Sequence, residues 1–206
     1  MRNRLIALML VVQMAIISAG CLTPAAAPVL PEPLPPVITL APESTRATIS
    51  PGDMALKLAD LPPDYLLRER RVIAYSEVSQ ISRDLGWQQG YAATFYRMNR
   101  EKEDLTGIRQ TISIYPSENM VKVYAIGTEE FLTGQKDITR FEIPFPAIGD
   151  KSIAFRETRD GDLQDFAIYT VIFKKKNVFE TITMGGTTTD YETLKDVTRK
   201  AAEKIP

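Results

Sequence analysis

Phe166-Ala167-Ile168-Tyr169-Thr170-Val171-Ile172-Phe173 is the stretch of this 206-residue chain that decides its fold. Apolar side chains occupy both alternating faces of this stretch, as in a central strand that is covered on each side. Lys174-Lys175-Lys176-Asn177 follows as a turn, and the chain returns through 178–184, which places Val178, Glu180, Ile182 and Met184 on one face. The sequence therefore predicts a β-hairpin at the middle of a sheet, ended by Gly185-Gly186.

Further strands and helices are predicted on both sides of this hairpin. The last is a helix that begins in a capping box from Thr189 to Glu192 and presents an apolar stripe of Tyr191, Leu194, Val197, Ala201 and Ile205. Other strands are expected at 65–74, 87–98, 107–115, 141–145 and 152–158. The strand at 141–145 is expected at an edge of the sheet, because Pro144 cannot donate a hydrogen bond within a central strand. Other helices are expected from the cap Ser76 to Gly86 and from Pro116 to Leu132. This order predicts an α+β domain, a mostly antiparallel sheet of about six to seven strands with two or three helices and a closing C-terminal helix.

The first twenty residues differ from the rest in composition. Arg2 and Arg4 precede the apolar run 5–17, which closes on small residues before Cys21. A basic start, an apolar stretch and a small-residue cleavage site are typical of a secretory signal. We therefore expect residues 1–20 to be a signal peptide, 21–55 a proline-rich extended linker, and 56–206 a single α+β globular domain.

Ser18-Ala19-Gly20-Cys21 resembles the lipobox of secreted lipoproteins, with Ser18 at a position where an aliphatic residue is usual. In that family the matching cysteine is lipidated and becomes the first residue of the mature protein. The resemblance implies lipidation of Cys21 and an extracytoplasmic protein anchored to the cell membrane. A signal that stays uncleaved as the anchor is the alternative. Cys21 is the one cysteine of the chain, so an intramolecular disulfide cannot form.

Charge and composition exclude several function classes. The formal net charge is −1, which is not the basic face that a nucleic-acid partner requires. The chain has no histidine, so the usual general base and the usual zinc ligand are both missing. We expect no cofactor and no catalytic residues.

Three motifs contain residues that could bind a ligand. Asp160, Asp162 and Asp165 could offer oxygen ligands to calcium, but a plain polar hairpin turn needs the same residues, and the full calcium-loop spacing is absent. Gly149-Asp150-Lys151-Ser152 departs from a phosphate loop, because Asp150 replaces the second glycine. Lys174-Lys175-Lys176 could contact anionic lipids, although lysines also keep a hairpin soluble.

The chain also resembles the Mog1/PsbP-type sandwich, found in several exported lipoproteins and receptor-kinase sensor domains. The resemblance rests on Ile148-Gly149-Asp150-Lys151-Ser152, on the hairpin 172–178 and on the closing helix after Gly185-Gly186, and it covers roughly residues 65–205. It implies a domain that binds or assembles.

Together these observations predict a lipid-anchored extracytoplasmic binding or interaction domain on a proline-rich stalk, without catalytic activity. Its partners would be the membrane, through the lipid on Cys21, and a protein or envelope ligand. Two alternatives stay open. One is a hydrolase that acts on envelope material with paired carboxylates. The other is a structural component of the envelope.

Overall fold

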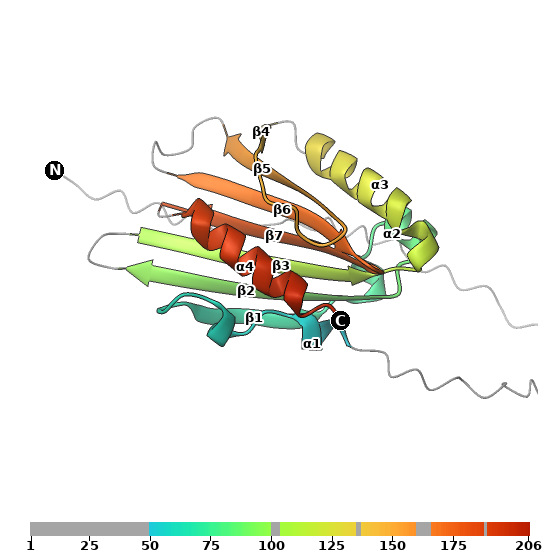
Figure 1. The fold of residues 1–206 in the computed structure, drawn as a ribbon, viewed down its shortest axis with the longest axis horizontal. Helices are drawn as coiled ribbons and strands as arrows, with labels where there is room; N and C mark the ends of the chain where they lie inside the picture. The colour runs from blue at the N-terminus through green and yellow to red at the C-terminus, as the bar shows by residue number, and fades with distance from the viewer. Residues whose placement is uncertain (1–49, 100–103, 135–136, 160–165, 188) are drawn as a thin grey trace, which may run out of the picture. The chain divides into compact units, whose positions relative to one another are not determined.

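A single antiparallel sheet carries the fold. The computed structural model describes residues 50–99, 104–134, 137–159, 166–187 and 189–206. Within these ranges seven strands form a sheet in the order β1-β2-β3-β7-β6-β5-β4, and every neighbouring pair is antiparallel (Figure 1). The strands are β1 Leu66–Val72, β2 Gln89–Asn99, β3 Asp104–Ile114, β4 Ile138–Ile143, β5 Lys151–Arg159, β6 Ala167–Lys175 and β7 Val178–Gly186. The α+β class and the antiparallel sheet are confirmed.

The predicted hairpin lies at the middle of this sheet. Val171, Ile172 and Phe173 are consecutive in β6 and all buried, so both faces of the strand are covered. In β7 buried and half-buried residues alternate along the whole strand, as the predicted one-sided face requires. β7 ends at Gly186, so Gly185 and Gly186 are the last residues of the hairpin, as predicted.

Helix α4, Tyr191–Glu203, covers one face of the sheet (Figure 1). Its buried Leu194 and Val197 belong to the same apolar core as Ile182 of β7. The predicted closing helix is confirmed, but its predicted cap was one residue early. Asp190 is the N-cap, and its carboxylate accepts hydrogen bonds from the backbone N–H groups of residues 192 and 193 at 3.0 and 3.2 Å.

Helix α3, Met120–Thr133, packs on the opposite face. Phe155 of β5 and Ile172 of β6 point to this face, because their neighbours along each strand belong to the core on the α4 side. Both cluster with Tyr124 of α3. Gly127 lies in the middle of this helix, where glycine is normally unfavourable. A Cβ at Gly127 would lie only 2.7 Å from the ring of Phe179, so the glycine lets α3 approach β7 closely.

The fold begins before Leu56. Helix α1, Pro51–Met54, falls inside the stretch assigned above to the linker, and its last residue is buried in the main core together with Ala55. Residues 1–49, with the predicted signal peptide and most of the linker, lie outside the described residues. The remaining short helices are η1 Leu58–Asp60, η2 Tyr75–Glu77, α2 Gln80–Asp84 and η3 Ser117–Asn119. Ser79, not Ser76, caps α2.

β1 and β4 form the two edges of the sheet. The predicted edge strand at 141–145 is confirmed as β4, although it ends at Ile143, one residue before Pro144. Within the described ranges, no helix combines the length and the apolar composition that crossing a membrane requires.

Candidate functional site

The predicted site residues lie outside the described part of the chain. Cys21 precedes it, and Asp160, Asp162 and Asp165 fall in the gap between β5 and β6. Their lipidation and metal binding therefore stay predictions. Among the residues that the structure does describe, no group of three or more metal-ligating side chains gathers.

A hollow of about 460 Å³ opens where β4 and β5 separate. The two strands are paired as far as Ile143 and Ala154, and the chain between them leaves the sheet as the loop 144–150. Glu142, Phe145 and Ser152 line this hollow. The start of β5 therefore has no β4 partner on this side, and Glu142 beside it is exposed.

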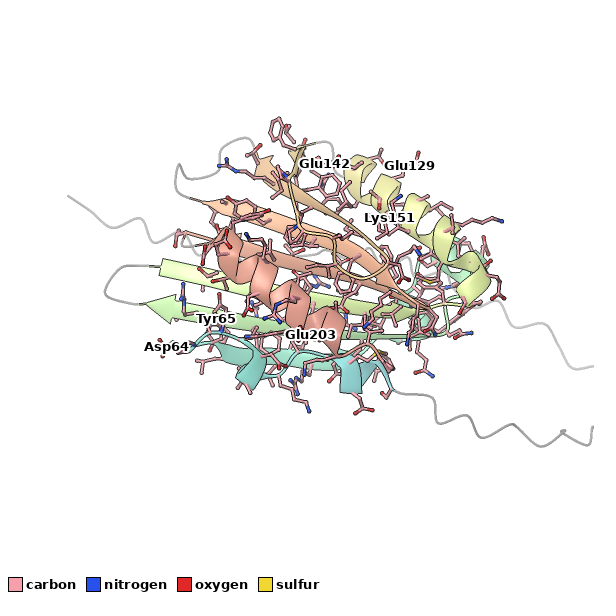
Figure 2. All side chains as sticks on the ribbon, viewed as in Figure 1. Asp64, Tyr65, Glu129, Glu142, Lys151 and Glu203 are labelled. Carbon is pink, nitrogen blue, oxygen red and sulfur yellow. The ribbon has the colours of Figure 1, made fainter. Side chains whose placement is uncertain are left out.

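Tyr124 of α3 interacts with a cation and an anion of the neighbouring strands. The Lys151 ammonium lies 4.8 Å from the centre of the Tyr124 ring, and Figure 2 labels Glu142 and Lys151 on the strands next to α3. Burial, and secondarily the charge of Glu142, raises the pKa of Tyr124 to about 12. The Tyr124 hydroxyl is buried and makes no hydrogen bond. Lys151 and Glu142 could make polar contacts with a ligand here. The high pKa of Tyr124 keeps its phenol protonated at neutral pH.

A buried ion pair holds β4 against its neighbours. The Nε atom of Arg140 lies 3.3 Å from Oε2 of Glu157, and both side chains are less than a tenth exposed. The Arg140 guanidinium also stacks 4.4 Å from the centre of the Phe131 ring on α3. The Thr170 hydroxyl donates to the other Glu157 oxygen at 2.6 Å. The sequence does not indicate this network, because nothing in the local pattern of β4 shows which strand lies next to it.

The motif Gly149–Ser152 is a structural turn. The backbone N–H of Asp150 donates to the carbonyl oxygen of Lys174 at 2.8 Å, and a Cβ at Gly149 would lie 2.5 Å from that oxygen. Ser152 accepts from the N–H of Ile148 at 3.1 Å and donates to the carbonyl oxygen of Pro146 at 3.2 Å. Its hydroxyl is therefore engaged in folding the loop.

The lysines of the β6–β7 hairpin are partly engaged as well. The Lys175 ammonium donates to the carbonyl oxygens of Ala202 and Ile205, at 2.9 and 2.5 Å, and so caps the C-terminal end of α4. Lys174 lies 3.8 Å from the Asp150 carboxylate. These contacts favour the structural interpretation of the lysine run over lipid contact.

Most carboxylates that line the smaller hollows are paired with cations of the same helix. Two hollows of about 340 Å³ each lie between the loop 144–150 and α4. Of their carboxylates, Glu192, Asp196 and Glu203 make ion pairs of 2.6 Å with cations of the same helix, and Asp150 lies 3.8 Å from the Lys174 ammonium. In the larger hollow, Glu142 has no second carboxylate among the described lining residues.

Glu180 is the described carboxyl group whose pKa is raised. Burial raises this pKa to about 8, and the hydrogen bond from Gln110 opposes the rise. Glu180 is fully buried in β7, on the face that α4 covers. It lines none of the three hollows described above. Glu180 is therefore a structural residue of the core. The sequence pattern predicted which face of the strand it lies on, but not that this face buries it beside Gln110.

Comparison with known proteins finds likeness in fold alone. No family model matches the chain, and a search of curated proteins finds no match either. Among solved structures, the chain is similar to the extracellular domain of PknH from Mycobacterium tuberculosis, with a TM-score of 0.55 and 6% identity, over 73% of this chain and 92% of that one. At this identity the likeness shows the fold alone. The resemblances to the lipobox and to the Mog1/PsbP group stay predictions.

Proposed function

We propose that this protein is exported, lipidated on Cys21, and displayed outside the membrane as a non-catalytic interaction domain on a proline-rich stalk. The observation that carries the proposal is the order of its first residues: a basic start, an apolar run and Ser18-Ala19-Gly20-Cys21, followed by the proline-rich segment. The likeness in fold to a domain described as extracellular supports the same location.

The described site supports interaction over catalysis. The polar groups around the loop 144–150 are used in its own folding, as Ser152 and Lys175 show. The carboxylates in the smaller hollows are paired with neighbouring cations. What this side of the domain offers is the opening between β4 and β5 and exposed apolar surface at Phe141, which is 55% exposed.

Metabolic labelling with a radioactive fatty acid tests the anchor. The native chain should carry the label and fractionate with membranes, and Cys21→Ser should lose it. Ser18→Leu is the matched control, because it restores the usual aliphatic residue and should keep the label. A label on the Cys21→Ser variant, or a native chain found in the cytosol with its leader intact, contradicts the proposal.

A further inference from the structure

Helix α3 carries two buried hydroxyl groups that have no hydrogen-bond partner in the protein. They belong to Tyr124 and Thr128, which lie one helical turn apart. Tyr124 as a whole is only 5% exposed, and its ring packs toward the sheet with Phe155 and Ile172. Buried hydroxyls normally have a partner, because leaving one without a partner lowers stability. The Tyr124 hydroxyl is therefore a group that a bound molecule can satisfy.

Tyr124 is connected to the hollow between β4 and β5 through its neighbours. Ile153 lines the hollow and packs in the cluster of Tyr124. Glu142 lines it as well, and after burial its charge is the second cause of the raised pKa of Tyr124, which requires the carboxylate to lie near the phenol. The Lys151 ammonium lies 4.8 Å from the centre of the Tyr124 ring. Glu142 is paired with Phe155, so residues 142, 151 and 153 share the α3 face of the sheet (Figure 2).

The charges of Glu142 and Lys151 are not compensated within the described part of the chain. Both side chains are exposed, and neither makes an ion pair with a described residue. A ligand of one charge would be attracted to one of these groups and repelled by the other, whereas a zwitterion can satisfy both. The volume of about 460 Å³ falls within the range of small-molecule sites.

From this geometry we propose that the hollow between β4 and β5 binds a small zwitterion, an amino acid or a short peptide. The ligand's ammonium group contacts the Glu142 carboxylate, and its carboxylate contacts the Lys151 ammonium and accepts a hydrogen bond from the Tyr124 hydroxyl. Phe145 and Ile153 offer apolar surface to the rest of the ligand. This binding goes beyond the proposed function, because it names a ligand and needs neither the lipid nor the stalk.

Calorimetric titration of the full chain carrying Cys21→Ser, in a non-ionic detergent, tests the proposal. The probes are alanine and alanylalanine, each compared with its N-acetylated form, which lacks the ammonium, and its C-amidated form, which lacks the carboxylate. At least one of the two zwitterions should bind with a Kd below about 1 mM. Both of its blocked forms should bind at least about tenfold more weakly, because each leaves one charged side chain without its partner.

Variants of the three polar side chains identify the site. Glu142→Gln and Lys151→Gln should each weaken binding of the zwitterion about tenfold. Tyr124→Phe keeps the ring and the contact with Lys151, so it should weaken binding about threefold to tenfold without lowering the melting temperature. The matched controls are Glu118→Gln and Lys122→Gln, which change exposed charges near the start of α3 and should bind like the parent chain. Circular dichroism checks that every variant folds.

Three results would overturn the proposal. They are no binding of either zwitterion at about 10 mM, equal binding of the zwitterions and their blocked forms, and unchanged binding in the variants of Glu142 and Lys151. Because Cys21 is replaced throughout, these outcomes do not depend on lipidation. A failure of the lipid anchor therefore leaves this proposal standing, and a failure here leaves the proposed anchor standing.

Discussion

Replacing Glu180 by glutamine should change how the stability of this protein depends on pH. Glu180 is fully buried in β7, where its Oε1 atom accepts a hydrogen bond from the side-chain amide of Gln110 at 2.6 Å. The Gln110 oxygen is already used by the backbone N–H of Leu56, at 2.8 Å, and the Glu180 Oε2 atom is buried without a partner. Burial therefore disfavours the charged form and raises the pKa of Glu180 to about 8.

The sign of the effect follows from proton binding. The ordinary pKa of this group is 4.5, so between that value and about 8 the native state holds a proton that the unfolded chain releases. Below pH 4.5 the carboxyl is neutral in both the native and the unfolded state, so Glu180 does not lower the free energy of unfolding by ionising. That free energy falls as the pH rises from 4.5 to about 8. At about 1.4 kcal/mol per pH unit, the free energy of unfolding should decrease by about 3 kcal/mol between pH 4.5 and pH 7. Above pH 8 the loss should level off near 5 kcal/mol.

Urea unfolding at pH 5, 7 and 8.5 measures this loss. Glu180→Gln resembles the protonated carboxyl in shape and cannot ionise, so its free energy of unfolding should lack this decrease. The two proteins should therefore diverge most at pH 8.5, with similar dependence on urea concentration. Glu118→Gln on the exposed surface is the control and should follow the native protein. If the native protein and Glu180→Gln show the same pH dependence, the argument about Glu180 is wrong.

Three further variants test other contacts by thermal or urea unfolding. Glu157→Gln leaves Arg140 buried without its counter-charge and should destabilise by about 3–5 kcal/mol, whereas a loss below about 1 kcal/mol would show that the pair is not buried as described. Gly127→Ala should destabilise the fold, although alanine normally favours a helix by about 1 kcal/mol; a higher melting temperature would contradict this. Asp190→Ala should cost about 1 kcal/mol through the lost cap, while Thr189→Ala should change little, and the reverse order would restore the predicted capping box.

Local patterns in the sequence were sufficient to predict the main helices and strands of the fold. The apolar run 166–173 predicted a central strand, because a strand that is covered on both faces needs apolar side chains on both. Proline at 144 predicted an edge, and helical spacing predicted α4. The caps were misplaced by one to three residues, at Thr189 and Ser76. Several nearby residues can cap a helix, and the backbone conformation that selects one depends on packing.

What the sequence by itself determined, then, is which segments are strands and helices and which face of each is apolar, because side-chain period follows directly from backbone geometry. The tertiary structure alone decided which faces meet. It paired Glu180 with Gln110, 70 residues away, set Arg140 beside Glu157, and turned Lys175 from the surface to the end of α4. These contacts depend on the order of strands in the sheet, which results from the packing of the whole core and leaves no mark on any single segment.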